Sequence, residues 1–308
     1  MQHLPTLKQL RYFAALEELQ HFGKAADACF VSQSAFSVAI KELETLLGVQ
    51  LVDRTRKRVT VTALGSDIAV QARLCLRDAE LLVQLAHQHA EPLAGRLSLG
   101  VIPTVAPFLL PGLAQALRRE HAELQLYLRE DFTDALLSDL LAGKLDLALM
   151  ALPYETPHME VMPLFRDPFR LACRRGTRHV DPKHYRFNRL HSDSVLLLED
   201  GHCLRDHALA ACRLRQADKV SRFAANSLLT LVQMVDADLG ITFLPAMAEG
   251  SSLLSETQVR TYPLDKGAYR EIGLVWRRGS ARGAEFRMLG ELVQRHRTPA
   301  SRPAEADR

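Results

Sequence analysis

The chain has 308 residues, of which 47% are hydrophobic and 24% charged, and its formal net charge is +3. This length predicts roughly two or three domains of ~100–200 residues each. The small net charge excludes a uniformly basic protein that coats nucleic acid, so any surface that binds DNA has to be local.

Membrane and secretion signals are not found in the sequence pattern. No uninterrupted apolar run reaches the ~18 residues that a membrane span needs. Residues 1–19 lack the apolar core and cleavage site of a signal peptide. Five cysteines in such a chain argue against a secreted disulfide framework and leave metal, catalytic and redox roles open. We therefore expect a cytoplasmic protein that contacts no membrane.

Three helices are predicted near the N-terminus. The first covers 7–20, the second follows Phe22, and the third begins after Ser32, a suitable N-cap, and stops at Gly48. Two short helices and a tight turn before a longer helix are typical of a helix-turn-helix motif. Apolar residues at helical spacing are expected to form the inner face of the third helix: Val38, Leu43, Leu46 and Leu47.

Polar and basic side chains follow the predicted turn. Short polar side chains at a helix N-terminus suit the major groove of double-stranded DNA. The next segment, RTRKR at 54–58, is basic and precedes an alternating strand, like a wing over the phosphate backbone. A helical hairpin with a solvated loop would give the same separate signals, but their order favours DNA binding. The candidate contacts are Gln33, Ser34, Ser37, Lys41 and Arg54.

A long helix is predicted over residues 64–90, which contain no proline and no glycine after Gly65. Its apolar stripe suits pairing with a second copy of the chain or packing against a domain. After Gly95 the pattern changes to short apolar strands that alternate with helices, which is typical of parallel βαβ units. Two series of such units predict two α/β lobes with a cleft between them, the usual place for a small ligand.

Two cysteines lie close together in the segment GHCLRDHALAAC, beside His202 and His207. Cys203 and Cys212 are compatible with core packing, with a metal site and with a redox pair. The H-C-x3-H-x4-C spacing is not a standard zinc pattern. An enzyme with Cys203 as nucleophile and His202 as base is a further alternative, but adjacent side chains seldom orient correctly for that. The sequence contains no phosphate-binding glycine loop, HExxH or GxSxG motif, so no cofactor and no metal are predicted.

Residues 21–65, HFGKAADACFVSQSAFSVAIKELETLLGVQLVDRTRKRVTVTALG, resemble the winged helix-turn-helix head of LysR-type transcriptional regulators. The resemblance covers nearly the whole chain. It implies a non-enzymatic regulator with an N-terminal all-α winged helix-turn-helix domain, a long linker helix and an α/β effector region of two Rossmann-like, periplasmic-binding-protein-like lobes. The expected boundaries are 1–62, 63–92 and 93–298 for these parts, with lobe I at 93–165 and 268–298, lobe II at 166–267 and a disordered tail at 299–308.

Three further segments, GVIPTVAPFLLP, LLLEDGHCLRDHALAAC and IGLVWR, resemble the hydrogen-peroxide sensors of that family. This resemblance implies that Cys203 reacts with peroxide and that Cys212 resolves the product as a disulfide. It also implies a peroxide pocket formed by Thr104, Thr133, His202 and Arg270. The implied partners are promoter DNA, RNA polymerase, further copies of the chain as a dimer of dimers, hydrogen peroxide, and reductants of the glutaredoxin or thioredoxin type.

The cysteine pair carries physical expectations of its own. A helix from Cys203 to Cys212 would separate the two residues by ~13 Å along its axis, whereas a disulfide needs Cα atoms within about 7 Å. Oxidation would therefore have to unwind the segment. The helix N-terminus, His202 and Arg205 are expected to lower the pKa of Cys203.

Some residues depart from the family pattern. His207 stands where we expect glutamine, Arg213 and Arg215 follow the second cysteine, and residues 174–191 are rich in arginine and histidine. The alternative function is a LysR-type regulator that binds a small organic effector in the cleft between the lobes.

Overall fold

The computed structural model describes residues 4–54, 59–87, 93–186, 190–211, 219–264 and 268–296. The chain divides into two compact units. Unit 1 comprises Met1–Pro92 and Ser138–Leu145, and unit 2 comprises Leu93–Leu137 and Asp146–Arg308. The basic residues 56–58, Cys212 and the expected tail at 299–308 lie outside the described residues. Within those ranges no helix has the length and apolar character that a bilayer crossing needs.

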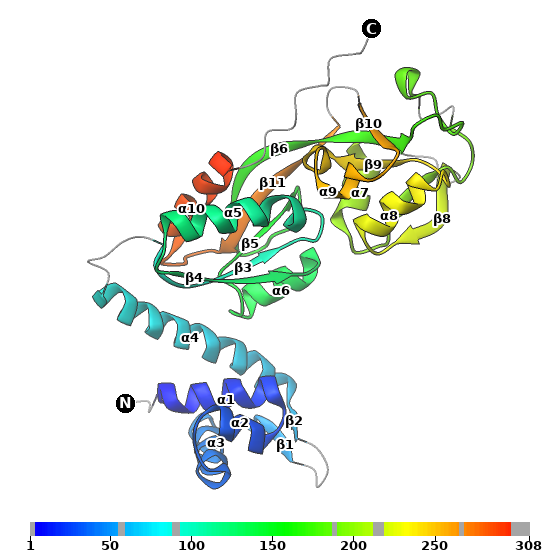
Figure 1. Ribbon diagram of the computed structural model, residues 1–308. Coiled ribbons are helices and arrows are strands. Elements are labelled where there is room, and N and C mark those ends of the chain that lie inside the picture. The colour runs from blue at the N-terminus through cyan, green and yellow to red at the C-terminus, as the bar shows by residue number, and fades with distance from the viewer. Residues whose placement is uncertain are drawn as a thin grey trace. The chain divides into compact units, whose positions relative to one another are not determined.

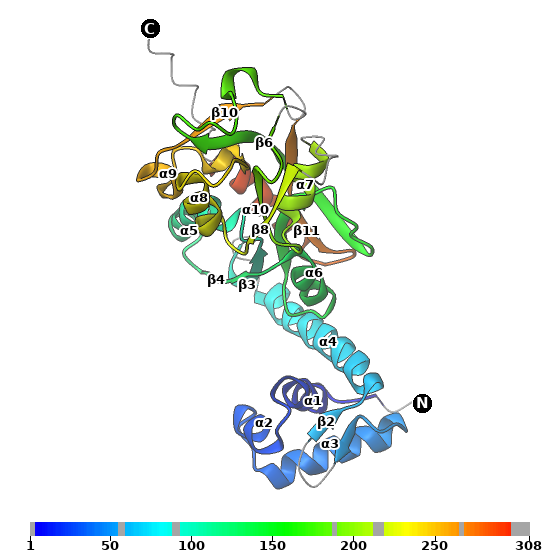
Figure 2. The ribbon, with the colours of Figure 1, turned by 90° about the vertical axis from the view of Figure 1, so that its right-hand side faces the viewer.

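Unit 1 contains the predicted helix-turn-helix and a short hairpin (Figure 1, Figure 2). The Ser32 hydroxyl accepts a hydrogen bond from the backbone N–H of Ala35 at 3.3 Å, and Gly48 ends the third helix in a left-handed conformation with φ of 68°. These two caps confirm the predicted bounds of that helix. The elements are α1 (Leu7–Leu19), α2 (Phe22–Ala28), α3 (Gln33–Leu47), β1 (Val52–Arg54), β2 (Val59–Val61) and the long helix α4 (Ala63–His87).

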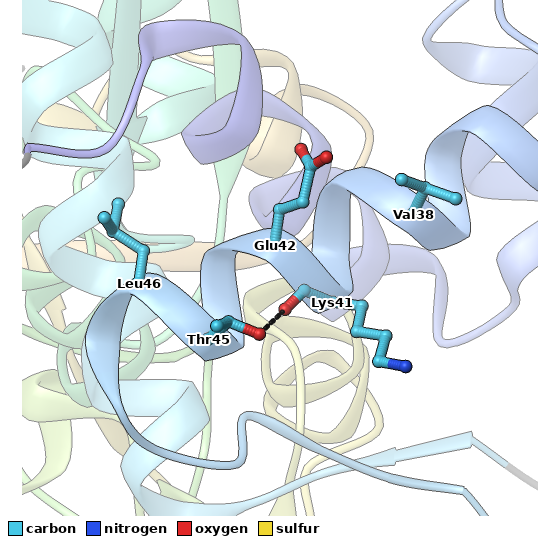
Figure 3. A pocket seen from close by; sticks show the side chains of 5 residues that line it. All are labelled: Val38, Lys41, Glu42, Thr45 and Leu46. Atoms are coloured by element: carbon cyan, nitrogen blue, oxygen red, sulfur yellow. Dashed lines mark hydrogen bonds between the residues drawn. The ribbon is translucent and has the colours of Figure 1, made fainter.

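The inner face of α3 differs from the prediction. Phe36, Ile40 and Leu43 are buried in the core of unit 1, and the Phe36 ring stacks on Tyr12 with centroids 5.1 Å apart. Their spacing of four and three residues fixes the phase of the helix. Val38 is 56% exposed and Leu46 36% exposed, so the expectation was wrong for both. They line a shallow hollow on the outer face together with Lys41, Glu42 and Thr45 (Figure 3).

A carboxylate connects α3 to the hairpin. One oxygen of Glu44 accepts hydrogen bonds from the backbone N–H groups of Leu51 and Val52, at 2.9 and 3.1 Å. These two N–H groups stand at the start of β1 and are partly buried. Without Glu44 they would have no hydrogen-bond acceptor in place of water, which is costly. Glu44 therefore fixes the point at which the hairpin leaves the helical core.

We expect Glu44→Ala to destabilise unit 1 by about 1–3 kcal/mol, because two backbone donors lose a charged acceptor. Urea denaturation measures the loss, and hydrogen–deuterium exchange of peptides covering 49–54 shows whether it is local. Glu42→Ala is the matched control, since Glu42 is exposed on the same helix. Equal protection of 49–54 in the two variants would contradict the assigned role.

Unit 2 is built on a seven-stranded sheet in the order β10-β6-β11-β5-β3-β4, with β9 also paired to β6. β3 pairs in parallel with β4 and β5, whereas β11 is antiparallel to β5 and β6. A smaller parallel sheet joins β7 and β8. The strands are β3 (Gly95–Val101), β4 (Leu124–Glu130), β5 (Leu147–Leu152), β6 (Met159–Arg174), β7 (Val195–Leu198), β8 (Val220–Ala225), β9 (Thr242–Pro245), β10 (Val259–Pro263) and β11 (Tyr269–Arg277).

Helices cover these sheets as the alternating pattern predicted. The helix α5 packs beside α10, and α8 packs against β6 and β7 (Figure 1). Every residue of β5 is buried, as expected for a continuous apolar strand. The helices are α5 (Ala106–Glu120), α6 (Thr133–Leu141), α7 (Cys203–Ala211), α8 (Leu228–Asp236), α9 (Ser252–Ser255) and α10 (Gly283–His296), with 3-10 turns η1 (Pro182–His184) and η4 (Ala246–Ala248).

The strand β6 joins the two lobes. It pairs with β11 along residues 159–168 and with β9 and β10 along residues 169–174. Proline cannot donate a ladder hydrogen bond, so Pro163 and Pro168 would ordinarily interrupt a strand. Pairing with β11, with a register shift between Ile272 and Gly273, continues the strand through both prolines.

The helix α7 is held by two histidines. The Nε2–H of His207 donates to the carbonyl oxygen of Pro153 at 3.1 Å, just after β5, and the ring of His202 meets Phe132 edge-on with centroids 4.7 Å apart. Burial lowers the pKa of both histidines below their ordinary value of 6.5. The folded chain therefore favours their neutral forms.

We expect thermal stability to be lost as the pH falls below about 6.5, because the unfolded chain then binds protons that the buried rings resist. His207→Gln should reduce this loss below about pH 6.5, as measured by melting temperature against pH. His184→Gln is the control, because His184 is 81% exposed in its pair with Asp181. An acid slope that is equal in all three proteins would refute the role of His207.

Candidate functional site

A small pocket in unit 2 lies at the start of α7. It is formed where the loop after β3, the beginning of α6 and the turn before α7 meet. Its empty volume, including space open to solvent, is about 160 Å³. The pocket brings together Cys203 and three of the four predicted pocket residues, Thr104, Thr133 and His202. The full lining consists of Ile102, Pro103, Thr104, Phe132, Thr133, Gly201, His202 and Cys203.

The fourth predicted pocket residue, Arg270, lies behind this pocket on β11 and is fully buried. Its Nη1 donates to the Thr104 hydroxyl at 2.8 Å, and its Nη2 donates to the Thr104 carbonyl oxygen at 2.9 Å. Its Nε donates to Asp167 at 3.0 Å. The guanidinium is therefore fixed on both sides and held against a pocket residue.

Opposing influences act on the pKa of the Cys203 thiol. The side chain is 7% exposed at the first position of α7. Burial is the largest influence and raises its pKa, while Arg270 and the Thr133 hydroxyl lower it and Asp206 raises it further. The expectation of a lowered pKa was wrong, because desolvation of the thiolate outweighs the helix N-terminus.

Arg205, which we expected to lower the pKa of Cys203, binds other groups. Its Nε pairs with Asp200 at 2.9 Å, and its Nη1 donates to the carbonyl oxygen of Leu198 at 3.1 Å. The guanidinium therefore ties α7 to the end of β7. The charge that favours the Cys203 thiolate comes from Arg270. Arg270 lies 67 residues after Cys203, so the residues around the cysteine do not indicate it.

His202 keeps a free acceptor. A carbonyl oxygen accepts only, so the 3.1 Å contact with Asn226 requires the hydrogen on Nε2 and leaves Nδ1 as a lone pair in the neutral ring. That Nδ1 is buried and has no hydrogen-bond partner within the described ranges. Burial lowers the pKa of His202, so the folded chain favours the neutral ring.

Cys212 lies outside the described residues, so the predicted disulfide partner has no described position. The four cysteines that are described are free thiols. Burial, with Asp238, raises the pKa of Cys173 to about 11, which makes that thiol a poor nucleophile. Over the described part of the chain, no group of three or more His, Cys, Asp or Glu residues is arranged to hold a metal ion.

Four of the five predicted DNA contacts lie on α3. Gln33, Ser34 and Lys41 are exposed and Ser37 is half-buried, beside the buried face of Phe36, Ile40 and Leu43. Arg54 is the last residue of β1, at the base of the hairpin. The arrangement presents short polar groups and one cation from a helix that could enter a major groove.

Asp167 and Met247 were missed by the sequence analysis. Asp167 is 3% exposed and pairs with Arg270, and the sulfur of Met247 lies 3.6 Å from the Arg270 Nη2. Neither stands in a motif. Asp167 stands between Arg166 and Pro168, so its neighbours in the chain do not mark it as a buried residue.

Comparison with known proteins places both parts of the chain. Residues 7–66 match the model of the bacterial regulatory helix-turn-helix protein, lysR family, and residues 90–298 match the LysR substrate binding domain. The regulator EstR of Acinetobacter baylyi is 37% identical over 96% of this chain and 98% of its own length. The hydrogen peroxide-inducible genes activator of Dickeya chrysanthemi is 38% identical over 94% and 95%, respectively.

A solved structure is similar over the same extent. The hydrogen-peroxide-bound OxyR mutant of Corynebacterium glutamicum is 35% identical, covers 96% of this chain and 94% of its own, and superposes with a TM-score of 0.64. The chain therefore belongs to the LysR family of transcriptional regulators, which bind DNA and are not enzymes.

Proposed function

We propose that this regulator senses hydrogen peroxide through reversible disulfide formation between Cys203 and Cys212 and then activates oxidative-stress genes. The observation that carries the proposal is the pocket in which Cys203 lies beside Thr104, Thr133 and His202, with Arg270 directly behind. The names of the relatives from Dickeya chrysanthemi and Corynebacterium glutamicum point in the same direction.

The tightness of the pocket argues against an organic effector at this position. Sites for drug-sized ligands usually measure about 300–1,000 Å³, whereas the empty space of about 160 Å³ around Cys203 consists of gaps too narrow for a water-sized sphere. A ligand can enter only if side chains move, and a molecule as small as hydrogen peroxide needs less movement than an aromatic or sugar-like effector.

The chemistry needs a base and a stabilised leaving group. The sulfur of Cys203 attacks one peroxide oxygen, the O–O bond breaks, and the departing hydroxide takes a proton and leaves as water, giving a sulfenic acid. Because burial raises the pKa of the thiol, its proton has to leave as the sulfur attacks, and the departing hydroxide can take that proton. The hydroxyls of Thr104 and Thr133 and the charge of Arg270 would stabilise the negative oxygen.

The second step changes the fold. The thiol of Cys212 attacks the sulfenic acid, a second water leaves, and a disulfide forms. Cys203 and Ala211 are the ends of α7, ~12 Å apart along the axis, and Cys212 follows Ala211 by one Cα step of ~3.8 Å. A bridge with Cα atoms within about 7 Å therefore requires α7 to unwind. Unwinding would release the contact of His207 with Pro153.

The remaining parts of the proposal concern partners. Oxidation would rearrange lobe II and with it the contacts among copies in a dimer of dimers, which changes how the heads engage promoter DNA and recruit RNA polymerase. Reductants of the glutaredoxin or thioredoxin type would reset the switch by thiol–disulfide exchange.

Cys203→Ser should abolish the response to peroxide and leave DNA binding intact, because the substitution removes the nucleophile and lies in unit 2. Peptide mapping after a brief pulse of stoichiometric hydrogen peroxide should find a Cys203–Cys212 bridge in the wild-type chain. The control Cys173→Ser should form the same bridge. If Cys203 of the wild type stays a thiol, or oxidises no faster than Cys173, the peroxide proposal fails. A regulator of the cleft-binding type, with a small organic effector, would then be the remaining candidate.

Arg54→Ala should weaken DNA binding in the reduced and oxidised states alike, because the side chain is expected to contact phosphate. A DNA fragment selected from random sequences is titrated with each protein at several salt concentrations. The slope of log affinity against log salt should be smaller in magnitude by about 1 for Arg54→Ala than for the unsubstituted protein. Arg175→Ala, which removes an exposed cation from the other unit, is the control. An unchanged slope for Arg54→Ala would remove this residue from the interface.

A further inference from the structure

A buried ion pair lies behind the Cys203 pocket. Arg270 on β11 and Asp167 on β6 are direct cross-strand partners in the antiparallel ladder that joins the lobes. Their Nε–Oδ2 distance is 3.0 Å, and their side chains are 0% and 2% exposed. A pair removed from water to this degree persists only when each charged atom has partners.

Asp167 uses both of its oxygens. Oδ2 accepts from Arg270, and Oδ1 accepts from the backbone N–H of Met247 at 3.1 Å, in η4 of lobe II. Burial raises the pKa of Asp167, while Arg270 and the backbone donors of Met247 and Ala246 act against that rise. Arg270, Met247 and Ala246 all donate to this one carboxyl group, and these hydrogen bonds stabilise its ionised form.

Arg270 in turn holds a residue of the pocket. Its two terminal nitrogens hold the hydroxyl and the carbonyl oxygen of Thr104, which lines the pocket. The connected groups therefore run from Met247 through Asp167 and Arg270 to Thr104. Asp167 is the member that fixes the direction of the guanidinium, because it holds the Nε side while Thr104 holds the other.

We propose that Asp167 is a positioning residue: it holds the guanidinium of Arg270 toward the pocket and thereby sets how readily Cys203 forms the reactive thiolate. The inference rests on the proposed function for its meaning in peroxide sensing. Asp167 does not line the pocket and acts only through Arg270.

Other groups around Cys203 set the background against which Arg270 acts. His202 is adjacent, Asp206 follows one turn later on α7, and Thr133 faces the thiol from α6. Tyr154 stands in the loop after β5, with a pKa raised to about 12 by burial and by its hydrogen bond to Asp134, so it stays neutral. Arg270 is the largest influence that favours the thiolate.

Asparagine at position 167 tests the proposal with little change in shape. An amide offers one acceptor and one donor group, whereas both oxygens of Asp167 accept. Asp167→Asn must therefore turn an N–H group toward either Arg270 or Met247. In either case one link is replaced by two opposed donors, and the guanidinium is no longer held from both sides.

The experiment is a titration of the Cys203 thiolate by its ultraviolet absorbance in the full chain, with the matched Cys203→Ser protein subtracted. Asp167→Asn should shift the midpoint upward by about one unit, which is about tenfold less thiolate at neutral pH. The rate of oxidation by peroxide should fall by a similar factor. An unchanged or lowered midpoint overturns the proposal.

Two comparisons separate positioning from a general loss of structure. Asp146→Asn removes another buried carboxylate, which accepts from Ser98 N–H at 2.7 Å and pairs with Arg282 at 3.5 Å. It should lower the melting temperature without moving the Cys203 titration. In an Arg270→Met background, which leaves no guanidinium to orient, adding Asp167→Asn should move the midpoint no further, and an additional shift would contradict action through Arg270.

The two hypotheses fail in different ways. If the wild-type chain does not oxidise at Cys203, the peroxide function is wrong, while the titration still tests Asp167 because it needs no peroxide. If Asp167→Asn alone does not fold, Asp167→Glu keeps the charge but moves the carboxylate by one methylene group, and an unchanged Cys203 midpoint in that variant contradicts the proposal.

Discussion

The cross-strand pair of Arg270 and Asp167 is the interaction on which the site depends. It lies where β6 and β11 pass between the lobes, and its hydrogen bonds reach Thr104 on one side and Met247 on the other. Removing two opposite charges from water is costly, and the cost is offset only when the geometry satisfies both. Because Asp167 and Thr104 bind different nitrogens of the guanidinium, the side chain of Arg270 is held toward the pocket.

The pocket itself combines opposing demands on Cys203. Burial protects the thiol and raises its pKa, while Arg270 and Thr133 favour the thiolate. Under the proposed function, a thiol whose pKa is raised by burial is protected from adventitious oxidants at rest. Selectivity would thus come from the shape and hydrogen bonds of the pocket rather than from a permanently ionised sulfur.

The position of this thiol on α7 links the chemistry to the fold. The helix is only nine residues long and begins at Cys203, and it is held by the contact of His207 with Pro153, by the two contacts of Arg205, and by the buried Leu204 and Ala208. In the proposed switch, a covalent bond that cannot form while the helix stands would select a second packing of the same segment. The disulfide would therefore have to outweigh these contacts.

Local features were determined by the sequence alone. The caps at Ser32 and Gly48, the uniformly buried β5 and the start of a helix at Cys203 follow from side chains a few residues apart, because hydrogen bonds in turns and the period of a helix act over that range. The resemblance to a family brought Thr104, Thr133, His202 and Arg270 together in advance. The pocket, in turn, shows which of these residues lines the cavity and which lies behind it.

Only the tertiary structure decided the rest. The phase of α3 was set by which residues meet Tyr12, and β6 continued through two prolines because β11 pairs with it. The direction of the Cys203 pKa depends on how much water the fold removes. Asp167 gained its role from a partner 103 residues away. Burial and charge pairing depend on distances in space, which the order of residues along the chain does not contain.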